Sequence, residues 1–414
     1  MNPAITPEME RRNGRIFLIS YVLIFFAAPV LYIGIVQAAL CNKLGASAMV
    51  SNLPAATYML GSLCPLVLSW LVPPRLNRAV VVWSNVITAI LIGGVFLTLA
   101  IPFSTEVRIA ALVLQGLVQG FCASASQVFM ISCLRSGTTP AGQAQALKTT
   151  FTITPLCAVA GSLGAQFILN SGIPSLKYPY DFALVHLIGV PCVALVAWFT
   201  SRFQLPEVRD EPRQPAKAFF GDSAKALFTD RTMLVLWFGY LLWYITLNAS
   251  TNFSLYTREA MGRDPNELAG WIMAIRFGCK ALGGFVLGLI ALRFGLRASV
   301  ITTVALLGVG CLWAWVVPGY GYLLSFGIIG MGELGGAYFP NYVAAISPLA
   351  ISARNVAILT LAAPPSAIAP PLHGWLTDNY GFAASFAFGI FTAILCLALF
   401  RFDRKPESSG STLS

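Results

Sequence analysis

The sequence predicts an all-α membrane protein with twelve transmembrane helices in two six-helix bundles. Of its 414 residues, 57% are hydrophobic and only 10% are charged, whereas soluble proteins carry about 25% charged residues. The apolar residues gather into runs of roughly 20, which is the length a helix needs to cross a hydrocarbon core about 30 Å thick. The basic residues fall mainly in alternate connections between these runs, as in membrane proteins.

Six apolar runs precede a polar interruption and six follow it. The first six cover 16–39, 50–71, 79–101, 107–134, 144–169 and 181–200, and the second six cover 233–256, 267–292, 297–317, 320–346, 354–377 and 382–400. The first run is longer than the apolar part of a typical cleaved signal, and no small-residue cleavage site follows it. We therefore expect it to remain as the first helix. Four prolines in the eleventh run, Pro364, Pro365, Pro370 and Pro371, predict a break there.

The formal net charge of +10 does not indicate a nucleic-acid partner, because the basic residues form no single patch. The excess of Lys and Arg on one side instead sets the orientation of a membrane protein. With both termini in the cytoplasm, the external side holds five basic residues, Lys43, Arg108, Lys177, Arg258 and Arg263. The cytoplasmic side holds Arg11, Arg12, Arg15, Arg75, Arg78, Arg135, Lys148, Arg293, Arg297, Arg354, Arg401, Arg404 and Lys405. We expect a multi-pass protein of the inner or plasma membrane.

The polar interruption predicts a division of the chain into an N-terminal half at 1–200, a cytoplasmic linker at 201–231 and a C-terminal half at 232–414. The linker is rich in proline and mixed charge, which is typical of a connector. Within it, residues 216–228 alternate aromatic and charged side chains, which fits a short interfacial helix or an ordinary connector.

The two halves show signs of duplication, and their loops carry family motifs. RLNRAVVV starts at Arg75 after the second run, and RFGLRASV starts at Arg293 after the eighth. The segment GLIALRFGLR, from Gly288 to Arg297, is similar to the loop signature of the major facilitator superfamily, with Leu292 at the position of the signature's acidic residue. The segment GWLTDNYGF resembles the signature that ends the eleventh helix in many members. The motif residues are Gly288, Arg293, Gly295, Arg297, Gly374, Asp378 and Gly381.

This resemblance implies a solute transporter that works by alternating access, with a site near the middle of the membrane between its two repeats. It implies a small-molecule substrate, the lipid bilayer as surroundings, and a coupling proton or ion as one option. The loop after the second run, from Ser69 to Arg78 with Pro73 and Pro74, departs from the signature because it has lost the glycines and the acid. The motifs therefore indicate the superfamily and not a substrate.

Three ionisable residues lie deep in apolar runs, where charge is costly and usually functional. Arg276 and Lys280 are four residues apart in the eighth run and so share a helix face. Glu333 in the tenth run reaches a similar depth and can pair with either. Two cations against one acid favour a small organic anion, bound by Arg276 through a forked contact. A buried ion pair that only locks two helices is the competing interpretation, and Glu333 is also a candidate proton-coupling group.

Polar side chains form two further stripes at helical spacing. Gln115, Gln119 and Ser126 share one face of the fourth run, while Trp237, Tyr244, Asn248 and Thr251 share one face of the seventh. Such stripes fit a wet cavity, and they fit hydrogen bonds between helices equally well. In the first run, Tyr21 lies near the interface, where aromatic residues anchor at the headgroups. Tyr32 lies deeper and is the better ligand candidate. We take Gln115, Gln119, Tyr32, Tyr244 and Asn248 as candidate substrate-binding residues beside Arg276, Lys280 and Glu333.

Other functional classes lack support in the sequence. The nine cysteines have no metal-ligand or CxxC spacing and act as small apolar residues, so we expect no metal, disulfide or cofactor. No catalytic cluster and no nucleotide-binding loop is present, so we expect no enzyme. A receptor or scaffold that does not transport, and an exporter of amphiphilic compounds, remain as alternatives.

Overall fold

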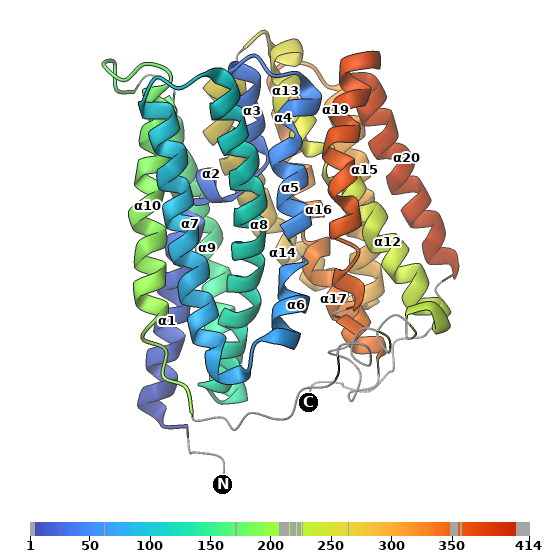
Figure 1. The fold of residues 1–414 in the computed structure, drawn as a ribbon. Coiled ribbons are helices and arrows are strands. Elements are labelled where there is room, and N and C mark those ends of the chain that lie inside the picture. Colours follow the sequence, from blue (N-terminus) through green and yellow to red (C-terminus); the bar gives the residue numbers. More distant parts are fainter. Residues whose placement is uncertain are drawn as a thin grey trace.

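The computed structural model describes residues 5–61, 63–169, 172–206, 215, 221, 225, 227–263, 265–347, 355–356 and 358–402. These residues form long helices that run side by side through one bundle (Figure 1). The N-terminal part holds α1 (Pro7–Phe26), α2 (Ala28–Leu31), α3 (Ile35–Lys43), α4 (Ala48–Ser51), α5 (Leu53–Gly61), α6 (Cys64–Leu71), η1 (Pro74–Leu76), α7 (Asn77–Ala100), α8 (Thr105–Ser136), α9 (Pro140–Leu169) and α10 (Tyr180–Thr200).

The C-terminal part repeats this plan. It holds α12 (Arg231–Leu247), α13 (Ser250–Met261), α14 (Pro265–Phe294), α15 (Leu296–Val316), η2 (Gly319–Leu323), α16 (Leu324–Gly332), α17 (Gly335–Ile346), η3 (Pro364–Ile368), α19 (Ala369–Tyr380), α20 (Phe382–Leu399) and η4 (Phe400–Phe402). Contacts within the N-terminal part join α7 to α8 and α10, and contacts within the C-terminal part join α15 to α16 and α20. The two parts meet mainly where α9 packs on α14, and where α3, α4 and α5 pack on α13, η3 and α19.

Eight helices of the described chain are long and apolar enough to cross a membrane. They correspond to predicted runs three to nine and twelve. The other four runs, at 16–39, 50–71, 320–346 and 354–377, are divided into shorter segments, and the seventh run is interrupted between α12 and α13. The prolines of the eleventh run are confirmed as a break, because η3 is a 3-10 segment that contains Pro364 and Pro365.

The surface of the bundle is apolar, as a lipid-facing surface must be. On α14, Phe285 and Leu292 are 71% and 83% exposed, while Ile272 and Phe277 on the same helix are buried in the core. An exposed apolar face of this kind would be unfavourable in water. With its long apolar helices, the chain is an integral multi-pass membrane protein.

Hydrogen bonds from side chains to backbone carbonyl groups join several predicted cytoplasmic connections at one end of the bundle. Asn13 of α1 donates to the carbonyl oxygens of Gly137, after α8, at 2.9 Å and of Gln204, after α10, at 2.8 Å. Arg78 donates to Phe203 O at 3.0 Å. The start of α1, the end of α6 and the end of α20 lie at this same end (Figure 1). Which end faces the cytoplasm stays a prediction from the basic residues.

The predicted division at 1–200, 201–231 and 232–414 also stays a prediction. Most of the linker, including most of the proposed interfacial helix at 216–228, lies outside the described residues.

Candidate functional site

The first membrane run is broken in the middle of the bundle, and this break presents Tyr32. Pro29 lacks an N–H and its ring would collide with the carbonyl four residues earlier, so α1 ends at Phe26 and α2 is a single turn. The backbone then passes through Tyr32 and Ile33 to Gly34. Its φ of 144° is a value that glycine adopts readily and other residues rarely adopt. A broken helix leaves carbonyl groups without partners inside the membrane, where each must be satisfied.

Two glutamines of α8 satisfy these carbonyl groups. Gln115 Nε2 donates to Val30 O at 3.0 Å and also to Gln119 Oε1 at 3.2 Å. Gln119 Nε2 donates to Leu31 O at 2.6 Å. Both side chains are almost fully buried. The two glutamines of the predicted stripe therefore stabilise the broken segment of the first run. Of these two side chains, only Gln119 also lines a cavity.

The tenth run is also broken, and this break presents Glu333. Four glycines within seven residues, at Gly330, Gly332, Gly335 and Gly336, weaken the helix at this point. α16 ends at Gly332, and Glu333 lies in the turn before α17. Trp243 Nε1 of α12 donates to Gly332 O at 3.1 Å and fixes the turn.

Four side chains from both halves meet at this depth, and we call them the charged cluster: Tyr32, Arg276, Lys280 and Glu333. Arg276 Nη2 is in direct contact with Glu333 Oε1, and Lys280 Nζ lies 3.2 Å from Glu333 Oε2. Tyr32 Oη donates to Glu333 Oε1 at 2.8 Å. The predicted pairing of Glu333 with Arg276 and Lys280 is thus present, with Tyr32 as an additional partner.

The charged cluster contains two cations and one acid, and the two cations differ in access. The side chains of Arg276 and Glu333 are 5% and 2% exposed, whereas that of Lys280 is 25% exposed. Arg276 also lies over the Tyr32 ring, 5.1 Å from its centroid. Within the described chain, Arg276 Nε is buried without a hydrogen-bond partner, which is uncommon for a buried polar atom. The cluster therefore has a donor, the Arg276 N–H at Nε, that is free to give a hydrogen bond to a ligand.

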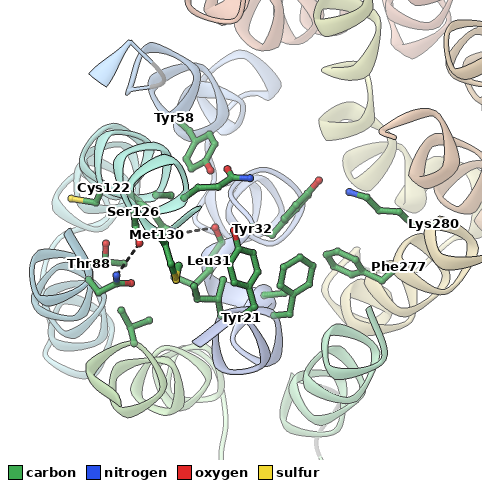
Figure 2. Close-up of a pocket in the computed structure, with 18 residues that line it drawn as sticks. Tyr21, Leu31, Tyr32, Tyr58, Thr88, Cys122, Ser126, Met130, Phe277 and Lys280 are labelled. Carbon is green, nitrogen blue, oxygen red and sulfur yellow. Dashed lines mark hydrogen bonds between the residues drawn. The ribbon is translucent and has the colours of Figure 1, made fainter. Parts of the chain in front are cut away.

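Two cavities meet at the charged cluster. The larger, of about 290 Å³, lies against α1, α2, α5, α7 and α8. The smaller, of about 220 Å³, is lined by Arg276, Glu333, Tyr244 and Asn248 among others. Tyr32, Tyr58 and Lys280 line both. Figure 2 shows Lys280 reaching from α14 toward Tyr32 across the space between the halves.

The residues of the seventh-run stripe are placed unequally. Tyr244 and Asn248 line the smaller cavity together with Thr251, and Asn248 Nδ2 donates to Tyr244 O at 2.8 Å. Trp237 lines neither cavity, and its Nε1 is buried without a partner in the described chain. Trp237 precedes Tyr244 by seven residues on α12, which is about 10 Å along the helix axis, so it lies at another depth of the bundle.

The expectation that Tyr21 anchors at the headgroups is wrong. Tyr21 is only 5% exposed and lines the larger cavity. Its ring contacts Phe17 and Phe25, with ring centroids 4.6 and 6.3 Å away. The physical reason is that α1 already begins at Pro7, so Tyr21 lies well inside the bundle.

The motif at the end of the eleventh run joins the two halves at the other end of the bundle. Asp378 Oδ1 and Oδ2 accept hydrogen bonds from the backbone N–H groups of Ala48 at 3.0 Å and Met49 at 2.9 Å. A carboxylate at a helix start also meets the positive end of the helix dipole. Gly374 packs so closely that a Cβ there would lie 2.5 Å from Met49 Cα, which explains the glycine.

Next to Asp378, the two halves share a buried amide pair. Asn52 Nδ2 donates to Asn252 Oδ1 at 2.6 Å and to Pro370 O at 3.1 Å. Asn252 Nδ2 in turn lies 2.8 Å from His373 O and 3.0 Å from Ser385 Oγ. We call the contacts made by Ala48, Met49, Asn52, Asn252, Pro370, Gly374 and Asp378 the outer seam.

The motif after α14 serves local packing in this structure. Gly295 and Gly381 have positive φ values of 86° and 80° and begin the connections to α15 and α20. Arg297 Nη2 donates to Phe400 O at 2.6 Å, while Arg293 lies over the Phe294 ring at 5.4 Å. A Cβ at Gly288 would meet no atom within 4 Å. Among the described residues, no group of three His, Cys, Asp or Glu side chains could hold a metal ion.

Sequence reasoning missed several residues that the structure brings together, including Tyr58, Phe277, Asn52 and Asn252. An isolated asparagine in an apolar run was the available signal for Asn52, because buried amides need partners. Tyr58 and Phe277 gave no signal, since aromatic residues are common throughout these runs.

The family model of the Major Facilitator Superfamily matches residues 259–414. No curated protein matches the sequence. Several solved structures share the fold. A D-xylose–proton symporter superposes with a TM-score of 0.71 at 14% identity, covering 97% of this chain and 99% of its own.

Two other solved transporters superpose as well. A variant of the nucleoside transporter NupG has a TM-score of 0.70 at 14% identity, covering 96% and 100% of the two chains. An autoinhibited POT family peptide transporter has a TM-score of 0.70 at 11% identity, covering 97% and 99%. At these identities, the superpositions show that the chain shares the fold of these transporters.

Proposed function

We propose that this chain transports a small organic anion by alternating access. The premise is that it is a major facilitator superfamily protein, by its fold and by its family-model match over residues 259–414. The observation that carries the proposal is the charged cluster. Its two cations and single acid leave one positive charge at the meeting point of two cavities. A buried charge without a counterion is costly, and an anionic substrate would neutralise it.

Arg276 and Lys280 have different roles in this proposal. Lys280 meets the substrate first, because it lines both cavities and is the more exposed cation. Arg276 keeps Glu333 in place and offers its unpaired Nε to the substrate. A guanidinium group suits this dual role because its planar fork can hold two acceptors at once.

Glu333 is our candidate for proton coupling. Its carboxylate is the shared partner of Tyr32, Arg276 and Lys280. Protonation of Glu333 would remove its charge and release both cations to the substrate, so proton and anion would bind together. Deprotonation would restore the ion pairs and expel the anion.

The outer seam supports a state that is closed at one end. Asp378, Asn52 and Asn252 join the halves at the end opposite to the predicted cytoplasmic connections. Rocking of the two halves about a central site requires these contacts to break when the outer end opens. The α9–α14 contact, where Gln166 Oε1 accepts from Gly270 N at 2.6 Å, is our candidate for the axis of that motion.

Uptake by purified protein in liposomes tests the proposal, after ligands are found by thermal-shift screening of small anions, cations and neutral solutes. Binding to the native state raises its melting temperature by mass action. We expect uptake of an anionic hit to be abolished by Arg276→Gln and to rise with an inward proton gradient. Arg263→Gln, at an exposed position outside both cavities, is the matched control. Normal uptake by Arg276→Gln would contradict the anion site.

A receptor or scaffold that does not transport, and an exporter of amphiphilic compounds, give different results. A scaffold would show no substrate-dependent flux in liposomes. An exporter would accumulate substrate only in vesicles of inverted orientation.

A further inference from the structure

Most of the side chains that line the larger cavity are apolar or aromatic. Its aromatic walls come from Tyr21, Phe25, Tyr32, Tyr58 and Phe277, and Lys280 is the one charged residue among those that line it. Figure 2 shows these walls on both sides of the cavity, with the Lys280 ammonium group at one edge.

Three donors in the wall of the larger cavity, on Asn85, Thr88 and Gln119, already bond to protein. Asn85 Nδ2 donates to Val81 O at 2.8 Å and to Ser126 Oγ at 2.9 Å. Thr88 Oγ1 donates to Ser84 O at 2.8 Å. Gln119 Nε2 donates to Leu31 O at 2.6 Å. A solute rich in hydroxyl groups would have to leave its water for a wall where these three donors are already engaged, which is unfavourable.

Lys280 lies between the aromatic side chains of the larger cavity and the carboxylate of Glu333. Its Nζ is 5.9 Å from the ring centroids of both Tyr32 and Phe277 and 3.2 Å from Glu333 Oε2. A carboxylate bound to Lys280 could therefore place an apolar or aromatic group directly against these rings. Aromatic pairs in such positions gain about 0.5–1.5 kcal/mol beyond their burial.

The charge of the cluster selects a monovalent anion. While Glu333 is ionised, one carboxylate neutralises the single excess positive charge of Arg276, Lys280 and Glu333. A phosphate monoester carries about −1.5 to −2 near pH 7 and would overcompensate, as would a dicarboxylate. The volume of about 290 Å³ lies near the lower end of ligand pockets, roughly 300–1,000 Å³, and suits a body of about one ring.

We propose that the substrate is an amphipathic monocarboxylate, with its carboxylate on Lys280 and a compact aromatic or apolar body in the larger cavity. This inference rests on the proposed transport function and deepens it. The body packs between the rings of α1 and α14, so substrate binding bridges the two halves at the depth of the breaks in the first and tenth runs.

A matched set of probes tests the proposal on the full-length purified protein, with affinity measured by thermal shift and by calorimetry. Benzoate has both features, acetate lacks the body, benzamide lacks the charge, and phthalate has two charges. D-Xylose and adenosine represent neutral polar solutes. We expect benzoate to bind at least tenfold more tightly than every other probe.

Two variants locate the benzoate. Lys280→Gln keeps the Arg276–Glu333 pair and should weaken benzoate at least tenfold, while Lys280→Arg retains most of the affinity. Ala123→Phe puts a ring into the larger cavity and should weaken benzoate at least tenfold without affecting acetate. Val128→Phe adds the same ring on the lipid-exposed side of the same helix and should change nothing.

The outcomes separate the two proposals. Tighter binding of phthalate, D-xylose or adenosine than of benzoate would overturn the monocarboxylate while leaving transport intact. Benzoate affinity that is insensitive to both Lys280→Gln and Ala123→Phe would also overturn it. Failure of every probe to bind, together with no flux of any screened solute in liposomes, would remove the transport function itself.

Discussion

The outer seam and the charged cluster both join the two halves, but they differ in charge balance. In the outer seam, Asp378 meets backbone N–H groups at a helix start and Asn52 donates to Asn252. The one charged group among these residues is thus paired without a ligand, although Asn52 Oδ1 has no partner within the described chain. In the charged cluster, two cations face one acid and Arg276 Nε is unpaired. In our proposal, the outer seam therefore sets the resting state, whereas the charged cluster binds the ligand.

The largest expected effect comes from removing the acid of the charged cluster. Glu333→Gln leaves Arg276 and Lys280 facing each other without a counterion, and breaking a buried ion pair from one side costs roughly 3–5 kcal/mol. We expect a large fall in melting temperature in detergent, partly restored by an anionic ligand. Glu259→Gln, at an exposed position of α13, is the control. A melting temperature equal to that of the wild type would show that the ion pairs of Glu333 do not stabilise the fold.

A smaller effect is expected at the outer seam. Asp378→Ala removes the acceptors for the N–H groups of Ala48 and Met49, and losing a carboxylate at a helix start costs about 0.5–2 kcal/mol. The balance should shift toward the state open at the outer end. The reporter is Ser51→Cys in a background without native cysteines, because Ser51 is buried beside the seam.

In that assay, an impermeant thiol reagent should label Ser51→Cys faster when Asp378→Ala is present. Ser104→Cys, exposed between α7 and α8, should label equally in both backgrounds. Equal labelling of Ser51→Cys would show that the outer seam does not hold the two halves together.

Tyr32→Phe should have a still smaller effect, because it deletes one hydrogen bond and keeps the ring. The lost bond from Tyr32 Oη to Glu333 is worth about 1 kcal/mol, which corresponds to a several-fold change in ligand affinity. Calorimetry with the best anionic ligand measures this change. No loss of affinity would show that Arg276 and Lys280 alone orient Glu333.

The smallest effect is expected at the predicted cytoplasmic end, where Glu10 accepts from Thr139 N at 2.8 Å at the start of α9. Hydrogen bonds from the Thr139 side chain and backbone hold the pKa of Glu10 below its ordinary value of 4.5. Such a group stabilises the fold above its unfolded pKa, and this stabilisation is lost as the pH falls through the folded pKa. Glu10→Gln should therefore lower the melting temperature slightly at pH 7 and not at pH 3. An equal shift at both pH values would rule out this role of the charge.

Much of the fold was predictable because the bilayer imposes it. Apolar runs of fixed length must become helices, since no other backbone structure satisfies its hydrogen bonds there. The runs at 79–101, 107–134 and 181–200 thus match α7, α8 and α10 closely. The pairing of Glu333 with Arg276 and Lys280 was predictable for the same reason, because isolated charges are too costly at that depth.

The breaks within the runs depended on tertiary contacts, and so did the hydrogen bonds that the freed backbone groups make. The sequence showed Pro29 and the glycines around Glu333, but not that Gln115 and Gln119 would bind the freed carbonyl groups of the first run. Nor could it show that Asn52 would meet Asn252, 200 residues away. By itself the sequence determined that the chain spans a membrane, where its helices lie and which charges are buried. The reason is that hydrophobic burial depends on the composition of the chain and on the spacing of its apolar residues. The tertiary structure decided which cation is accessible and where the halves join, because these depend on the packing of helices far apart in the chain.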